Sequence, residues 1–336
     1  MSTSDSPDCT RVVDQLLDRY DLHPVVVDIG ASGPPRTTWD LVARHSVFVG
    51  FDPDLREISE LAGTGFHRAV MINEAATAEK GKDRITFFLT RSPYCSSTLE
   101  PDLASHAEYS LVDLFEVERQ VEVKATTIDA VLARLDLDGV HWFKVDSQGT
   151  DVRLFNSLSQ QVRDRVLCVE VEPGLIAGYK GEDVFIDAHR ELVAQGFWLS
   201  DANLCGLPRI RQSSMQRLRQ SRPEIDAAVV GTRCRATPAW VEATYLRSID
   251  HLSRQDAPAT DYVLLWAFAL VGKQWGFALD VAWAYEDRFG RDETATAMAS
   301  PLVEWFERPL PRPGAIRRIK ALVPVPVKQW VKQQWL

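Results

Sequence analysis

Short, valine-rich apolar runs alternate with amphipathic stretches over the first two hundred residues of this chain. Continuous apolar runs of this length are typical of buried parallel strands. The amphipathic stretches between them are suited to connect one parallel strand to the next. The pattern therefore predicts an α/β fold with a doubly wound sheet. The clearest candidate strands are VVVDIG at 25–30, SVFVGFD at 46–52, HWFKVD at 141–146 and VLCVEVEP at 166–173.

The remaining elements follow from the same periodicities. Thr10 and Thr127 are candidate caps, because a threonine side chain can accept a hydrogen bond at a helix N-terminus. Gly272 and Gly276 indicate a break in the last long helical stretch. We expect helices at 11–20, 37–44, 55–61, 127–135, 151–158, 183–195, 240–252 and 262–289, and extended segments at 69–72 and 84–90.

The length of 336 residues suggests about two domains, and the composition changes along the chain. We expect an N-terminal tail and helix at 1–23 and the α/β domain at 24–205. A helical extension at 206–305 would pack on the sheet or on a second subunit. A basic amphipathic tail occupies 306–336.

The charge balance and the cysteines exclude several classes of function. The net charge is −9, which argues against nucleic acid as the main partner. Five cysteines without a CxxC pair give neither a zinc site nor a disulfide framework, so a reducing compartment fits best. The N-terminus lacks the features of a signal peptide. The longest apolar run, at 262–272, is shorter than the roughly 20 residues that span a bilayer. We therefore predict a cytoplasmic protein.

A glycine turn follows the first strand directly. The segment runs from Asp28 to Gly33 and includes Gly30, Ala31 and Ser32. Glycines there let the backbone turn tightly and approach a ligand closely. The G-x-G-x-x-G fingerprint of dinucleotide sites is absent, and two prolines come next, which removes amide donors from a phosphate cradle.

The second strand ends in an acid, Asp52, about twenty residues beyond the glycine turn. An acid in this place can accept hydrogen bonds from both ribose hydroxyls of a nucleoside. With Asp28, Gly30 and Gly33 it describes a nucleoside site without a phosphate grip, and S-adenosylmethionine is such a ligand. The alternative is an ordinary strand-to-helix turn.

Five segments in order resemble FkbM-type S-adenosylmethionine-dependent methyltransferases: VVVDIGASG, VGFDPD, TTIDAVL, FKVDSQGTDVRLFNSL and LCVEVEPG. The similarity covers about residues 24–204. It implies a Rossmann-like methyltransferase fold with a seven-stranded sheet. It also implies that the enzyme methylates hydroxyl groups, often of sugars or polyketides. The family commonly has Asn where this chain has Ser32, and the twin prolines are unusual. The resemblance implies that Asp28, Gly30 and Gly33 line the methionine part of the cofactor, that Asp52 holds the ribose, and that Asn73, Glu74 and Ala75 border the adenine.

Paired charges lie on two neighbouring strands. Lys144 and Asp146 share a face because they are two residues apart, and Glu170 and Glu172 repeat this spacing. Asp146 is the first candidate for the base or for acceptor binding, and Glu172 the second. Lys144 completes the candidate catalytic set, although an ion pair with either glutamate inside the sheet is the alternative. A divalent cation on the acids is open but not favoured, and no metal ligands are assigned.

Other groups are weaker candidates. His106 is a distant second choice as base, and a surface position fits it better. The loop at 92–98 is as consistent with a wall over the acceptor pocket as with a plain surface loop. The tryptophans beyond residue 205 fit a core better than a ligand cage, although their faces also suit sugar stacking.

The tail from 307 to 336 carries seven Lys or Arg and one Glu. Its basic, Trp-bearing, amphipathic pattern fits an interfacial helix at 312–336, at the inner face of a membrane. Docking on the acidic body is the alternative.

Taken together, the cofactor turn, the strand-end acids and the resemblance predict an O-methyltransferase for a small-molecule or glycan acceptor, such as a lipid-linked sugar or an envelope polysaccharide precursor. The rival hypothesis is a non-catalytic methyltransferase-fold scaffold. The sequence does not determine the oligomeric state.

Overall fold

The computed structural model describes residues 7–33, 35–54, 65–110 and 112–309. The helix expected at 55–61 and the proposed interfacial helix at 312–336 lie outside the described residues, as does the first of the twin prolines.

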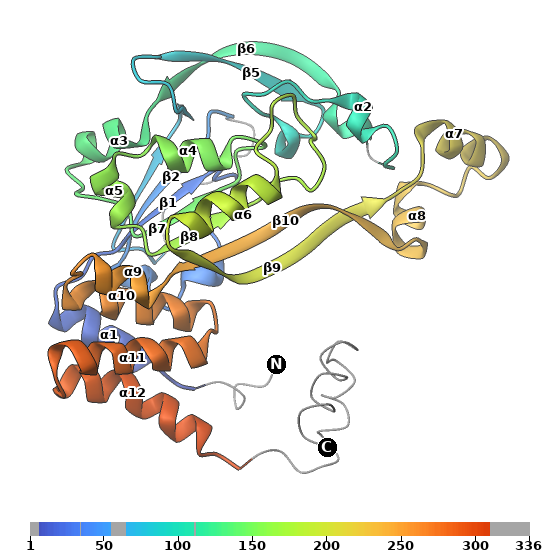
Figure 1. The fold of residues 1–336 in the computed structure, drawn as a ribbon. Coiled ribbons are helices and arrows are strands. Elements are labelled where there is room, and N and C mark those ends of the chain that lie inside the picture. Colours follow the sequence, from blue (N-terminus) through green and yellow to red (C-terminus); the bar gives the residue numbers. More distant parts are fainter. Residues whose placement is uncertain (1–6, 34, 55–64, 111, 310–336) are drawn as a thin grey trace.

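A seven-stranded sheet forms the centre of the molecule (Figure 1). The first five strands of the order β3-β2-β1-β7-β8-β10-β9 run parallel, and β10 is antiparallel to both of its neighbours. The predicted α/β fold with a seven-stranded sheet is thus confirmed. The strands are β1 (Val25–Ile29), β2 (Val47–Phe51), β3 (Arg68–Ile72), β7 (Trp142–Val145), β8 (Cys168–Val171), β9 (Phe197–Pro208) and β10 (Ala236–Arg247).

The helix expected at 240–252 is wrong. This segment belongs to β10, and only its end enters the short helix α9 (Ile249–Arg254). Val241, Ala243 and Tyr245 are buried at every second position, which is the period of a strand. The edge of β8 needs a hydrogen-bonding partner, and β10 supplies it. The sheet therefore takes its sixth strand from beyond residue 205, within the stretch expected to be a helical extension.

Most of the other helices lie where the periodicity predicts them. Thr127 caps α3, since its Oγ1 accepts a hydrogen bond from the Ala130 amide at 3.3 Å. Thr10 is the first residue of α1 rather than its cap. The stretch at 37–44 forms two short 3₁₀ turns, η1 (Thr37–Trp39) and η2 (Ala43–His45), in place of a helix. The expected helices are α1 (Thr10–Arg19), α3 (Ile128–Leu135), α4 (Asp151–Ser157) and α6 (Phe185–Ala194), and the short helices α2 (Leu103–His106) and α5 (Gln160–Asp164) are additional.

Helices cover both faces of the sheet. On one face, Val26 and Trp142 pack in one apolar cluster with α1 and three C-terminal helices, α10 (Ala259–Val271), α11 (Trp275–Phe289) and α12 (Glu293–Phe306). These helices lie together at the lower left of Figure 1. On the other face, Val27 and Phe143 pack with side chains of α3, α4 and α6. Nine consecutive residues of α10 are buried, as in a helix enclosed on all sides. Within the described residues, none of the helices is both long and apolar enough to cross a bilayer.

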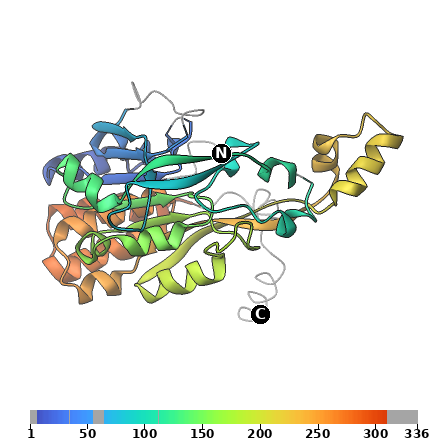
Figure 2. The same cartoon turned by 90° about the horizontal axis from the view of Figure 1, so that it is seen from above.

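A smaller sheet of β4 (Ala75–Ala76), β5 (Arg84–Thr90) and β6 (Val117–Thr126) arches over the top of the molecule in Figure 1. The hairpin of β9 and β10 extends from the body to the right in Figure 1 and carries α7 (Gln212–Ser221) and α8 (Ala227–Arg233) at its far end. Figure 2 shows the same protrusion from above. Both features border the cavities described next.

Candidate functional site

A cavity lies at the carboxyl ends of the parallel strands, where open α/β sheets bind ligands. The turns after β1, β2 and β7 form its floor, and the loop 92–98 and the small sheet form its wall. Among the predicted residues, the cavity brings together Gly30, Ser32, Asp52 and Asp146. Asp28, Ala31 and Gly33 line an adjoining pocket, which also contains Lys144.

Gly30 is held in a close contact that no other residue type allows. Its φ is +78°, and a Cβ there would lie 2.2 Å from the carbonyl oxygen of Asp146. The amides of Gly30 and Ala31 both donate to the carbonyl of Phe51, at 2.9 and 3.1 Å. The turn is therefore fixed between β2 and β7, with the backbone of residue 30 against the strand end that carries Asp146.

A buried ion pair crosses the sheet below this turn. The register pairs Asp28 with Lys144, and Lys144 with Glu170, on three adjacent strands. Lys144 Nζ lies 2.7 Å from Asp28 Oδ1, and both side chains are buried. The partner of Lys144 is thus Asp28, and not Glu170 or Glu172 as the structural alternative proposed. Burial raises the pKa of Asp28, while the Lys144 ammonium opposes that shift.

Arg36 joins the two glutamates of β8, a role that the sequence did not reveal. Its guanidinium donates to Glu172 Oε1 at 2.8 Å and lies 3.5 Å from Glu170 Oε2. Glu170 also accepts a hydrogen bond from Trp142 Nε1 at 2.7 Å. Burial, with the nearby Asp146 carboxylate, raises the pKa of Glu172 to about 8. The Lys144 and Arg36 charges oppose that shift.

Asp52 follows β2 as predicted, and its side chain faces the cavity. Its Oδ1 accepts a hydrogen bond from the Asp54 amide at 2.8 Å, and burial raises its pKa to about 6. Asn73 Nδ2 donates to the Asp52 carbonyl at 2.8 Å, and Glu74 forms an ion pair with Arg134 at 3.2 Å. The lining contains neither Asn73 nor Glu74. In their region it has Ala75, Ala76 and Phe87.

The turn after β7 is held by Asp151, which has only 1% of its surface exposed. The Asp151 carboxylate accepts hydrogen bonds from the amide and hydroxyl of Ser147, at 3.1 and 2.6 Å. It also accepts one from the Glu172 amide at 2.8 Å. Asp151 therefore ties the ends of β7 and β8 together and fixes the spacing of Asp146 and Glu172.

A second cavity of about 280 Å³ adjoins the first. This volume is near the lower end for small-molecule sites. Asp146 lines both cavities and the pocket of Asp28, so it stands where all three meet. Glu172 lines the second cavity, whereas Lys144 is not among its lining residues. Aromatic rings form much of the wall: His106, Tyr109, Phe115, Tyr179 and Trp240.

His106 is buried, so the expectation of a surface position is wrong. Its ring stacks on Phe115 with 3.7 Å between centroids, and its Nε2 lies 3.0 Å from the Gly178 carbonyl. Burial lowers the pKa of His106. The imidazole is therefore a neutral, flat surface of the cavity.

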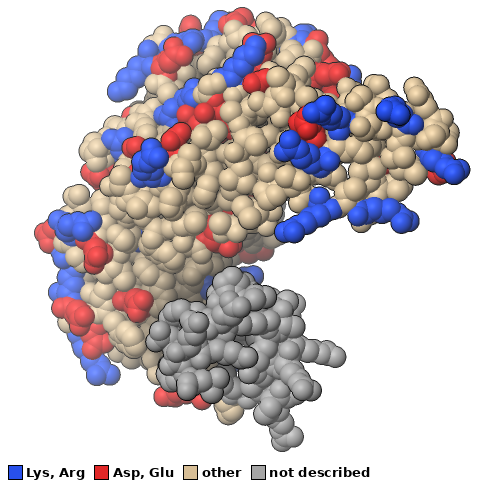
Figure 3. Space-filling model, turned by 45° about the vertical axis from the view of Figure 1, so that its right-hand side comes forward, with Lys and Arg blue, Asp and Glu red and all other residues tan. Residues whose placement is uncertain are grey.

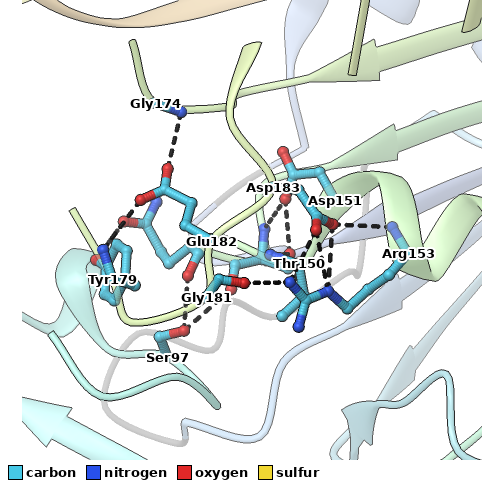
Figure 4. A network of polar contacts seen from close by, with 11 residues as sticks. Ser97, Thr150, Asp151, Arg153, Gly174, Tyr179, Gly181, Glu182 and Asp183 are labelled. Atoms are coloured by element: carbon cyan, nitrogen blue, oxygen red, sulfur yellow. Dashed lines mark hydrogen bonds and ion pairs between the residues drawn. The ribbon is translucent and has the colours of Figure 1, made fainter. Parts of the chain in front are cut away.

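The loop after β8 is folded around Glu182, as Figure 4 shows. The Glu182 carboxylate accepts hydrogen bonds from the amides of Gly174, Gly178 and Tyr179, at 2.9, 2.5 and 3.0 Å. The Tyr179 hydroxyl lies 2.7 Å from Gln148 Oε1 and 2.9 Å from the Cys95 carbonyl. Gln148 Nε2 in turn donates to Asp146 Oδ1. A chain of polar contacts thus connects this loop to Asp146.

The loop 92–98 contributes to the walls of both cavities, so it is more than a plain surface loop, and its place over an acceptor remains a prediction. Tyr94 lines both, Ser96 and Thr98 face the first, and Cys95 faces the second. Tyr94 is nevertheless 63% exposed, so its ring lies at the rim. Among the residues that the structure describes, no group of three or more His, Cys, Asp or Glu side chains has the arrangement of a metal site.

Comparison with protein families gave a match over half of the chain. The family model described as "Methyltransferase FkbM domain" matches residues 28–198. This range begins at the acid of the glycine turn and ends at the start of β9, so the second-cavity residues Leu207, Ala239 and Trp240 lie beyond it. Searches of curated proteins and of solved structures found no match.

Proposed function

Since this chain belongs to the FkbM methyltransferase family, we propose that it is an S-adenosylmethionine-dependent O-methyltransferase acting on a hydroxyl of a sugar or glycan. The observation that carries the proposal is the position of Asp146 between two cavities. One cavity has the features of a nucleoside site, and the other is lined by aromatic rings and acids. A group transfer between two ligands requires two adjoining sites, and Asp146 lines both cavities.

The first cavity fits S-adenosylmethionine by its chemistry. Gly30 lets the backbone approach closely, and Asp52 presents a carboxylate to the ribose hydroxyls. Asp146 and the other acids favour a cationic ligand. When bound, the cofactor supplies a methyl group that is already activated on a sulfonium. Gly30, Ser32, Asp52 and Asp146 are the residues that would hold it, with Asp28, Ala31 and Gly33 behind them.

The second cavity suits a sugar. Aromatic side chains such as Tyr179 and Trp240 can cover the apolar faces of a pyranose, and the acids can accept hydrogen bonds from its hydroxyls. Its volume of about 280 Å³ favours one ring at a time. A longer acceptor would extend out of the cavity.

Asp146 and Glu172 would act on the acceptor proton. An alcohol is a poor nucleophile until its proton leaves, and a positioned base contributes about a hundredfold or more. Asp146 is oriented by Gln148 and lies nearest to the cofactor cavity, so we assign it the role of base. Glu172 would accept hydrogen bonds from hydroxyls of the acceptor. Lys144 holds Asp28 and acts as a positioning residue.

The test is methyl transfer to a panel of glycans with the wild-type chain and with Asp146→Asn. We expect turnover of at least one glycan by the wild type and a loss of about a hundredfold or more in kcat of the variant at saturating cofactor. The rival scaffold hypothesis predicts cofactor binding without any turnover. Equal turnover by the two proteins would overturn the role given to Asp146.

A further inference from the structure

The far end of the β9–β10 hairpin is strongly basic. We call residues 209–235, which include α7 and α8, the arm tip. It contains seven arginines, no lysine and two acids, for a net charge of +5 in a chain of net charge −9. Figure 3 shows blue side chains gathered over this protrusion at the right of the view.

Most of these arginines have no acidic partner. Arg209 and Arg211 approach Glu108 at 3.4 and 2.6 Å. The other five form no salt bridge with any described residue, and all are exposed: Arg217, Arg219, Arg222, Arg233 and Arg235. Like charges gathered in this way repel one another, and a bound polyanion would relieve the repulsion.

The part of the same hairpin next to the arm tip lines the second cavity. Leu207, Ala239 and Trp240 line it, close in sequence to the arm tip on either strand. The Ser110 amide donates to the Pro208 carbonyl at 3.1 Å, which fixes this end of the strands beside the cavity wall. Arg209 and Arg235 flank the Pro208–Ala236 pair, so a ligand that leaves the cavity along the hairpin would meet them first.

The residue types indicate phosphate. The guanidinium fork matches the oxygens of a phosphate, and arginine is the residue of choice for this recognition. A bilayer contact would also need exposed apolar anchors. None of the described side chains of the arm tip is a large exposed hydrophobic one.

We infer that the arm tip binds the phosphate groups of an extended, phosphodiester-bearing acceptor, one sugar of which enters the second cavity. This inference rests on the proposed function for the identity of the cavity. The spread of the arginines along the tip favours a long anion over a single phosphate, because only a long anion can contact several of them at once.

The experiment titrates the full-length protein with orthophosphate and with a short-chain inorganic polyphosphate, at low and moderate salt. The variant Arg217→Gln/Arg219→Gln/Arg222→Gln removes three charges from the arm tip. The matched control Arg190→Gln/Arg254→Gln/Arg308→Gln removes three exposed charges elsewhere. We expect polyphosphate to bind far more tightly than orthophosphate, and the arm variant to lose about tenfold or more in affinity with a weaker salt dependence. The control should bind as the wild type does.

Three results would overturn the inference: no polyphosphate binding, equal losses in the two variants, or orthophosphate binding as tightly as the polymer. Arm-dependent binding to phosphatidylglycerol vesicles without binding to polyphosphate would assign the surface to a bilayer instead. None of these readouts involves methyl transfer. Binding of S-adenosylhomocysteine to the arm variant tests the proposed function separately.

Discussion

The backbone of Gly30 lies against the carbonyl of Asp146, so close that a Cβ on residue 30 would be 2.2 Å from that oxygen. The proposed cofactor turn and the proposed base are thus held together through the main chain. Any side chain at residue 30 must push β1 and β7 apart at the edge where the cavities meet.

Gly30→Ala should abolish binding of S-adenosylhomocysteine, measured by calorimetry, because the added methyl displaces the end of β7. The matched control is Gly81→Ala. Gly81 has nearly the same φ, +79°, but a Cβ on residue 81 would meet no other atom within 4 Å. Gly81→Ala should lose only about 1–2 kcal/mol of stability from the left-handed conformation, with full binding. Equal binding by the two variants would refute the close-contact argument.

The pH dependence of methyl transfer should contain a step near pH 8, because burial raises the pKa of Glu172 to about 8. If its ionised form accepts hydrogen bonds from the acceptor, the rate rises as pH increases through that value. Glu172→Gln should remove this step. A rate that falls through pH 8 in the wild type, or a profile unchanged in the variant, would show that Glu172 does not act in this way.

Affinity for S-adenosylhomocysteine should fall as pH drops below about 6. Burial raises the pKa of Asp52 to about 6. Below that pH the carboxylate that would accept hydrogen bonds from the ribose hydroxyls becomes protonated. Asp52→Asn should bind about tenfold more weakly at pH 8 and lose the pH dependence between 5 and 7. Glu74→Gln is the control, since Glu74 pairs with Arg134 outside the cavity. A pH-dependent affinity that survives in Asp52→Asn would assign the titration to another group.

Asp151→Asn should destabilise the fold by roughly 2 kcal/mol, because an amide cannot accept the three hydrogen bonds of this buried carboxylate. Denaturant unfolding measures the loss. Asp164→Asn, on an exposed position of α5, should stay within about 0.5 kcal/mol of the wild type. A stable Asp151→Asn protein would mean that the ends of β7 and β8 do not depend on this residue.

Much of the sheet could be predicted because its signals are local. A buried parallel strand such as Val25–Ile29 is apolar over most of its length, whatever its neighbours are. The strand β10 could not be identified in this way. Its residues, which include Trp240, Glu242 and Thr244, alternate between the two faces, and what makes them a strand is the free edge of β8.

The candidate site divides along the same line. Asp28, Gly30, Asp52 and Asp146 are at strand ends and follow from the sequence pattern. Glu182 and Tyr179 were missed, because their place in the cavity depends on how the loop after β8 folds back. The spacing of Gly174, Gly178 and Glu182 was the one available signal of a tightly turned loop. The predicted partner of Lys144 was wrong for a related reason. Both neighbouring strands, β1 and β8, offer an acid, and only the geometry selects Asp28.

The most direct test of the central claim is calorimetric titration of the purified full-length protein with S-adenosylhomocysteine, with NAD as the control ligand. The account predicts saturable one-to-one binding of S-adenosylhomocysteine and none of NAD, because the turn after β1 offers a nucleoside site without a phosphate cradle. Binding of NAD, or of neither ligand, would contradict it.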